Sequence, residues 1–264
     1  MKQDQTEQHL SIAEIIKLEK RFRAFGLQKW CGCDFAHDNG QNPDATDKMY
    51  RYADNFEELL EDGIGMTIYG GPGAGKSHAA AEIVNELTDR GYSCFFTNMN
   101  TVVTELNTMG FEGRRNFLNQ ICDKDLLVLD DLGSEMETPY CNQIFIQIVN
   151  TCLARNIPII ITTPFHQDVL TAKEGNNAKR VMAITRLLQR NINYTVLMPG
   201  ARRSRNLQQK RKMEALVKGG TVADQQALAF EEAEAETNET TVAECLPETV
   251  EQTLPFENIS EKEK

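Results

Sequence analysis

The sequence lacks several features that would place a protein in a membrane or outside the cell. It contains no run of about 18 apolar residues, so we expect no membrane span. No apolar stretch follows the polar residues 1–8, so we expect no signal peptide. The seven cysteines, an odd number spread over the chain, favour reduced thiols over a disulfide framework. Together these absences predict a cytoplasmic protein with no membrane partner.

Basic residues are almost absent from the C-terminal end, which carries most of the net charge of −11. Residues 219–264 hold 12 acidic and 2 basic residues, so the rest of the chain is close to neutral. The preceding residues 199–218 are basic, with seven Arg or Lys and one Glu. Because this end is rich in Glu and Thr and poor in aromatics, we expect residues 206–264 to be a largely disordered tail.

The remaining chain alternates between helical and strand patterns. Short apolar runs predict strands at 65–69, 92–97, 126–129, 158–162 and 193–198. Helical spacing predicts helices at 7–25, 47–62, 76–89, 100–109, 113–122, 138–154 and 178–189. Continuous apolar strands separated by helices are typical of a parallel sheet that is covered on both faces. The fold class we expect is therefore α/β.

A complete phosphate-binding loop, Gly-Gly-Pro-Gly-Ala-Gly-Lys-Ser, occupies residues 70–77 between a predicted strand and a predicted helix. This setting disfavours a chance glycine-rich turn. Backbone N–H groups of such a loop bind phosphates, Lys76 reaches the β- and γ-phosphates, and the Ser77 hydroxyl is a Mg²⁺ ligand. We expect Lys76 to face solvent when no nucleotide is bound. The predicted nucleotide contacts are Gly70, Gly71, Pro72, Gly73, Ala74, Gly75, Lys76, Ser77 and His78.

The strand predicted at 126–129 ends in two carboxylates, Asp130 and Asp131, which is a Walker B pattern. Strand ends of a parallel sheet border the ligand crevice, so Asp130 is expected beside Ser77, where it completes the Mg²⁺ site. We expect Asp131 to orient the attacking water. The alternative is an acidic turn after a core strand. The spacing from Lys76 leaves room for a further strand, which favours the ASCE branch of P-loop ATPases.

From about residue 50 to residue 205 the sequence resembles DnaC/DnaI-type replicative helicase loaders and the related IstB-type transposition ATPases. The resemblance rests on both nucleotide motifs and on residues 95–106, 125–133, 146–156, 158–163, 186–188 and 200–203. It implies an AAA+ P-loop domain with a parallel sheet flanked by helices, and ATP with Mg²⁺ as cofactors. It also implies three parts: a helical partner-binding segment at 1–49, the ATPase domain at 50–205 and the tail at 206–264.

The resemblance also assigns roles outside the two motifs. It implies that Thr163 is a sensor near the γ-phosphate, that Arg186 is a finger acting on a neighbouring subunit, and that Arg203, or its neighbour Arg202, contacts the nucleotide. The implied catalytic set is Lys76, Asp130, Asp131, Thr163 and Arg186. The family often has Asn near Thr163, and many AAA+ proteins have Glu at the place of Asp131. Both departures favour a slow, switch-like ATPase.

We therefore expect a helicase loader that self-associates through its ATPase domain, binds single-stranded DNA and delivers a hexameric replicative DNA helicase. A transposition helper that binds duplex DNA and a transposase is the first alternative. The second alternative is a nucleotide-gated adaptor that does not hydrolyse ATP. Residues 1–49 contain no basic run, which weakly favours a protein partner for that segment.

Two smaller patterns leave alternatives open. Cys31 and Cys33, near Asp34 and His37, either bind zinc or are small residues of a connecting loop; their spacing is tighter than that of most zinc sites. Between the second and third strands, aromatic and basic residues are mixed at Phe111, Arg114, Arg115 and Phe117. Such a mixture either holds single-stranded DNA or divides into core aromatics and solvated arginines.

Overall fold

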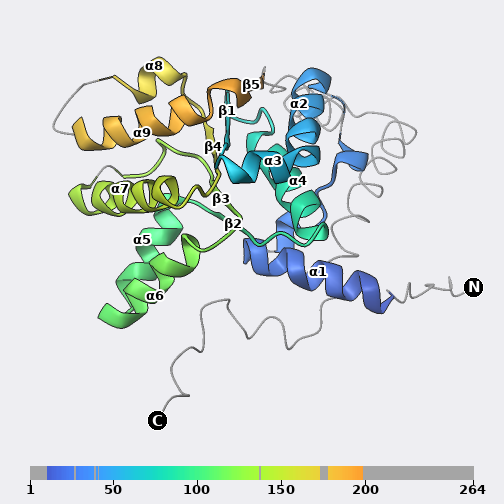
Figure 1. Ribbon diagram of the computed structural model, residues 1–264, viewed down its shortest axis with the longest axis horizontal. Helices are drawn as coiled ribbons and strands as arrows, with labels where there is room; N and C mark the ends of the chain where they lie inside the picture. The colour runs from blue at the N-terminus through green and yellow to red at the C-terminus, as the bar shows by residue number, and fades with distance from the viewer. Residues whose placement is uncertain are drawn as a thin grey trace, which may run out of the picture.

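A five-stranded parallel sheet forms the centre of the protein (Figure 1). The computed structural model describes residues 11–26, 28–38, 40, 42–136, 138–172 and 178–198. The strands are β1 (Met66–Gly70), β2 (Cys94–Thr97), β3 (Leu126–Leu129), β4 (Ile159–Thr163) and β5 (Thr195–Met198). Their order is β2-β3-β4-β1-β5, and every neighbouring pair is parallel. The expected parallel α/β sheet is confirmed.

Helices cover both faces of the sheet, as the ribbon shows (Figure 1). One face carries α1 (Ile12–Phe25), α2 (Pro43–Asp54), α3 (Phe56–Glu61) and α4 (Lys76–Asp89). The other carries α5 (Met99–Thr108), α6 (Phe111–Ile121), α7 (Pro139–Ala154), α8 (Gln167–Leu170) and α9 (Ala178–Arg190). Because successive strand side chains point to opposite faces, β2, β3 and β4 contribute to both hydrophobic clusters, whereas β1 and β5 contribute only to the cluster on the α4 face.

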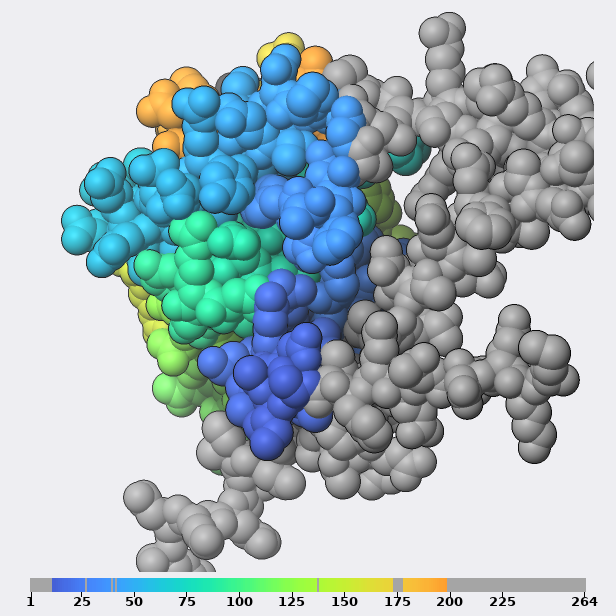
Figure 2. Space-filling view, turned by 90° about the vertical axis from the view of Figure 1, so that its right-hand side faces the viewer, coloured from blue at the N-terminus to red at the C-terminus, as the bar shows by residue number. Residues whose placement is uncertain are grey.

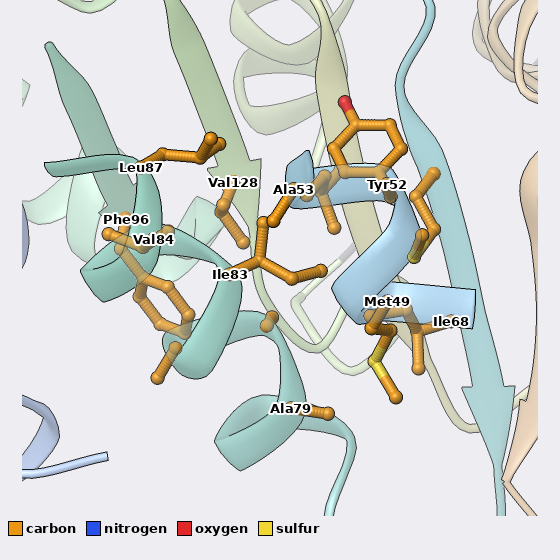
Figure 3. Packing of buried hydrophobic residues seen from close by; sticks show 14 of the residues in the cluster. Met49, Tyr52, Ala53, Ile68, Ala79, Ile83, Val84, Leu87, Phe96 and Val128 are labelled. Atoms are coloured by element: carbon orange, nitrogen blue, oxygen red, sulfur yellow. The ribbon is translucent and has the colours of Figure 1, made fainter. Parts of the chain in front are cut away.

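The cluster on the first face packs α2 and α4 against the sheet (Figure 3). Ile83 of α4 lies among Ala53 of α2 and Val128 of β3, and these side chains are fully buried. Tyr52 is also buried, and its hydroxyl donates a hydrogen bond to the carbonyl of Ile64 at 2.9 Å. This core fixes α4 on the sheet, and α4 is the helix that follows the phosphate loop.

Several predicted boundaries were wrong for local reasons. The first helix begins at Ile12 because Ser11 and Glu14 form a capping box, not at residue 7. The helix expected at 47–62 begins at Pro43, a residue suited to a first helical turn, and it ends at Asp54, with Asn55 separating α2 from α3. The short helix α8 was not predicted.

The N-terminal elements are part of the same body as α4. Ala24 and Phe25 of α1 share a hydrophobic cluster with α4, and the predicted boundary between residues 49 and 50 falls inside α2. Figure 2 looks onto this face, where blue and cyan N-terminal residues make up much of the coloured surface. The proposed division into three parts stays a prediction, and the tail at 206–264 lies outside the described residues. Within the described ranges, none of the helices has the length and apolar character needed to cross a membrane.

Candidate nucleotide-binding site

The phosphate loop follows β1 and depends on glycine at three positions. Gly73 and Gly75 have φ of +76° and +90°, in the left-handed region that favours glycine. A Cβ atom on Gly70 would lie 2.2 Å from the carbonyl oxygen of Met198 in the neighbouring strand β5. Larger residues at these positions are therefore excluded by backbone conformation or by the adjacent strand.

The N-terminus of α4 has backbone N–H groups that no side chain caps. Gly75 is the N-cap and offers no side-chain acceptor, and the first turn of α4 contains no acidic residue. By contrast, α5 and α7 are capped by Asn98 and Thr138, whose side chains accept backbone hydrogen bonds. An uncapped N-terminus presents its N–H groups and the positive end of its dipole to an anion. This end of α4 is thus suited to phosphate.

Lys76 is not exposed to solvent, contrary to our expectation. The residue is 8% exposed, and its ammonium donates hydrogen bonds to the carbonyls of Gly70 and Gly71 at 3.0 and 3.1 Å. Burial lowers its pKa below the ordinary value, while the carboxylates of Asp131 and Asp130 act in the opposite direction. The structure therefore brings the phosphate loop and the two predicted acidic residues into one electrostatic environment.

Asp130 and Asp131 are held by the end of β4. Val128 and Ile160 belong to the cluster on the α4 face, so Asp130 and Thr162, each two residues further on, continue that side of the sheet. The Thr162 hydroxyl donates to the Asp130 carboxylate at 2.6 Å and accepts from the Asp131 N–H at 2.8 Å. Asp131 is exposed and has φ of +56°, which is uncommon for a residue with a side chain. Thr162 thus connects the two carboxylate residues.

Thr163, the threonine that we predicted as the sensor, is directed elsewhere. It follows Ile161 on the opposite face of the sheet, and its hydroxyl donates to the carbonyl of Leu132 at 2.8 Å. The threonine that contacts Asp130 is Thr162, which sequence reasoning did not select. The alternation of side chains along β4 could have identified Thr162. It lies two residues after Ile160, so both side chains point to the face that α4 covers.

Ser77 and Asp130 are the residues that would hold Mg²⁺. Ser77 is partly buried at the start of α4, and Asp130 is partly buried beside Thr162. A hydroxyl and a carboxylate are the hard oxygen donors that Mg²⁺ prefers, so the donor set fits this ion. The ring of His78 instead interacts with Cys33 and Glu82, which raise the pKa of His78 to about 10. Its side chain is therefore engaged with the N-terminal segment.

The other predicted site residues lie apart from this centre or outside the described residues. Arg186 is exposed on α9, and Arg202 and Arg203 are outside the described ranges. In the part of the chain that the structure describes, no group of three or more His, Cys, Asp or Glu residues is placed to hold a metal ion. Cys31 and Cys33 are both buried.

The mixed aromatic and basic residues of α6 divide between core and surface. Phe117 is buried, whereas Phe111 is 85% exposed. The Arg114 guanidinium donates to the carbonyl of Leu106 at 2.7 Å, which joins α6 to the end of α5, while Arg115 is exposed. Phe111, Arg114 and Arg115 are thus exposed to solvent, whereas Phe117 belongs to the core.

Strand order and site together define the class of protein. Strand β4 lies between the phosphate-loop strand β1 and the acidic strand β3, which is the ASCE arrangement of the P-loop fold. Residues 57–213 match the family described as "IstB-like ATP binding protein". This match covers more than half of the chain, and the chain belongs to that family.

Curated relatives resemble the chain over part of their length. The "Replicative helicase loader DnaC" of Escherichia coli K12 is 31% identical over 146 residues, which are 54% of this chain and 57% of the relative. The "Uncharacterized protein YdaV" of the same strain is 29% identical over 138 residues, or 51% and 56% of the two chains. The chain thus spans a little over half the length of these relatives.

Two solved structures show the same fold. The crystal structure of DnaI covers 69% of this chain and 97% of its own, with a TM-score of 0.54 and 23% identity. The crystal structure of the DnaC helicase loader covers 66% of this chain and 99% of its own, with a TM-score of 0.51 and 21% identity. At these identities the likeness shows the fold alone. The predicted resemblance to DnaC/DnaI loaders and IstB-type ATPases is confirmed.

Proposed function

We propose that this protein is an ATP-dependent loader that delivers a hexameric replicative helicase to single-stranded DNA. The observation that carries the proposal is the arrangement of the phosphate loop after β1 and of Asp130 and Asp131 after β3, with β4 between these strands and Thr162 holding both acidic residues. The relatives named as replicative helicase loaders supply the biological setting.

The phosphates of ATP would lie against the uncapped N-terminus of α4. Lys76 would exchange its hydrogen bonds to the Gly70 and Gly71 carbonyls for hydrogen bonds to phosphate oxygens. Because both carbonyls belong to the phosphate loop, this exchange would be a local rearrangement. Ser77 and Asp130 would hold Mg²⁺, which neutralises charge on the phosphates. Asp131 would orient the attacking water, while the Thr162 hydroxyl fixes both acidic residues.

Self-association and DNA binding would use the opposite half of the molecule from α1. Arg186 is exposed on α9 and would reach the ATP site of a neighbouring subunit. Phe111 and Arg115 are exposed on α6, and an aromatic ring with a cation can stack on a base and contact phosphate. The N-terminal segment, residues 1–49, would hold the helicase.

The test compares ATP hydrolysis by the parent protein, Arg186→Ala and Lys76→Ala over a range of protein concentrations. We expect specific activity of the parent to rise with concentration, because a finger acts between subunits. Arg186→Ala should bind ATP normally and lose about a thousandfold in kcat, since a finger stabilises transition-state charge. Lys76→Ala should fail to bind ATP. A parent activity independent of concentration, with Arg186→Ala fully active, contradicts the proposed assembly.

The same assay separates the loader from a transposition helper, the role suggested by the IstB-like family description. We expect single-stranded DNA to stimulate hydrolysis more strongly than duplex DNA, and the purified replicative helicase of the source cell to bind the protein. Stimulation by duplex DNA alone, with no helicase binding, would favour the transposition role. No detectable turnover would favour an adaptor that only binds nucleotide.

A further inference from the structure

A buried ion pair contacts the loop that follows β3, residues 130–135, which we call the acidic loop. This pair is not part of the proposed nucleotide contacts. Arg180, in the first turn of α9, meets Glu135, which follows the acidic residues by four positions. Their side chains are only 4% and 3% exposed. The sequence separation of 45 residues means that the pair joins two parts of the chain that local structure does not bring together.

Both members of the pair make further polar contacts. The second carboxylate oxygen of Glu135 accepts the N–H of Gly133 at 2.7 Å. The Arg180 guanidinium donates to the side-chain oxygen of Asn142 at 2.8 Å and lies 4.7 Å from the ring centre of Phe145. The pair therefore connects the acidic loop with both α7 and α9, which pack side by side (Figure 1).

The acidic loop has an uncommon backbone conformation, which contacts with other parts of the chain must stabilise. Asp131 and Gly133 have φ of +56° and +97°, and a Cβ on Gly133 would lie 2.8 Å from the ring of Phe165. Three consecutive N–H groups are held: Asp131 by the Thr162 hydroxyl, Leu132 by the Thr162 carbonyl, and Gly133 by Glu135. The positive φ of Asp131 persists because its surroundings fix it.

We propose that Arg180 and Glu135 are a positioning pair that holds Asp131 in the orientation needed to act on the attacking water. This inference rests on the proposed ATPase function. The pair also ties the acidic loop to α9, and Arg186 lies six residues further along that helix, about 9 Å at the usual rise per residue. A neighbouring subunit that contacted Arg186 would therefore touch the same helix that the pair ties to the acidic loop.

A role in stability alone would not require these two charges. Burying two charges removes them from water, and well-packed apolar residues of similar volume often replace such pairs without loss of stability. Apolar replacement thus separates the two roles. It keeps the packing between the loop and α9 but removes the hydrogen bonds that fix Glu135 and, through it, Gly133.

The experiment uses the double variant Arg180→Met/Glu135→Leu and the control Arg190→Met in the full chain. Arg190 is on the same helix but donates to the carbonyl of Leu153, away from the acidic loop. We expect the double variant to remain folded and to bind ATP within about twofold of the parent, while kcat falls about tenfold to a hundredfold, as misplacement of a catalytic group by about 1 Å would cause. Amide hydrogen exchange at residues 131–133 should accelerate. The control should change neither kcat nor this exchange.

Retention of the parental kcat and of the slow exchange in the double variant would overturn the inference. If the parent itself shows no turnover, the proposed ATPase function fails, and amide exchange still decides whether the pair holds the loop. If the double variant does not fold, Arg180→Lys replaces it, because lysine keeps a charge paired with Glu135 but cannot reproduce the guanidinium that also binds Asn142. An unchanged kcat and unchanged exchange in Arg180→Lys would equally overturn the inference.

Discussion

Glu82 and Glu135 are both buried glutamates, one on each side of the sheet, but their surroundings differ. Both oxygens of Glu135 accept hydrogen bonds, one from Arg180 and one from Gly133. Glu82, on α4, is 1% exposed, and one of its oxygens has no hydrogen-bond partner among the described residues. The side-chain nitrogen of His78, 3.5 Å from that oxygen, is too distant for a good hydrogen bond.

The polar face of α4 shows the same incomplete pairing elsewhere. Asn85 donates to the carbonyls of Trp30 and Cys33 at 2.7 Å each, but its own side-chain oxygen has no partner within the described ranges. A buried polar group without a partner costs stability, whereas removing one member of a satisfied pair leaves the other unpaired. Burial of a polar residue therefore does not by itself predict whether its substitution will stabilise or destabilise the protein.

The largest effect is expected from Glu135→Ala. This change leaves the Arg180 charge buried without its carboxylate, and breaking such a pair costs about 3–5 kcal/mol of unfolding free energy. Urea denaturation of parent and variant measures the loss. Arg180→Met/Glu135→Leu is the control and should recover most of the stability, because no charge remains unpaired. If Glu135→Ala loses less than about 1 kcal/mol of unfolding free energy, the hydrogen bonds of Glu135 do not distinguish it from Glu82 in stability.

A smaller loss is expected from Arg21→Ala on the α4 face. Arg21 of α1 donates two hydrogen bonds to Asp89 of α4, at 3.0 and 2.5 Å, and one to the carbonyl of Cys31 at 2.6 Å. Asp89 keeps Lys17 at 3.0 Å and partial access to water, so its charge is not stranded. We expect a loss of about 1–3 kcal/mol and faster proteolysis of the N-terminal segment, as the connection between α1 and α4 weakens.

Arg23→Ala is the matched control for Arg21→Ala. Arg23 lies on the same helix but pairs with Glu19 at the surface, with side-chain exposures of 72% and 38%. Exposed pairs of this kind contribute little, so the change in unfolding free energy should stay within about 0.5 kcal/mol. Equal losses of unfolding free energy in the two variants would show that the Arg21–Asp89 contact stabilises the protein no more than an exposed ion pair does.

Local sequence patterns predicted the backbone of the nucleotide site well. The strand at 126–129 agrees with β3 at both ends, because four aliphatic residues are followed at once by Asp130 and Asp131. The glycines of the phosphate loop are constrained by backbone conformation and by one adjacent strand, both of which a short motif encodes. The five strands were all predicted, with errors of one or two residues at several ends.

Contacts between distant parts of the chain could not be predicted in this way. Periodicity identifies the apolar face of α4 but not what covers its polar face, so the burial of Glu82 and Asn85 beneath the N-terminal segment was missed. The partners Arg180 and Glu135 are 45 residues apart and carry no joint local signal. The choice of Thr162 over Thr163 needed only the alternation of β4, a signal that was present and not used.

The smallest effect, and one of opposite sign, is expected from Glu82→Gln. Burial raises the pKa of Glu82, the carboxylates of Asp38 and Asp34 add to the increase, and His78 opposes it without outweighing burial. A carboxyl whose pKa is higher in the folded than in the unfolded state destabilises the fold when it is ionised. That penalty is complete above the folded pKa and disappears below the unfolded value of about 4.3.

Glu82→Gln should therefore stabilise the protein at neutral pH by about 1 kcal/mol, the lower end of the cost of an unsatisfied buried group. The gain should shrink as the pH falls through the folded pKa, because the parent carboxyl then becomes protonated and loses its penalty. Urea denaturation from pH 8 to pH 4 measures this trend. Glu86→Gln, in the same helix, is the control: Glu86 pairs with Arg90 at 2.8 Å near the surface, so its variant should lose a few tenths of a kcal/mol. If Glu82→Gln is less stable than the parent at pH 7, the ionised carboxylate of Glu82 must stabilise the fold through His78. Glu82 would then be paired as fully as Glu135 is.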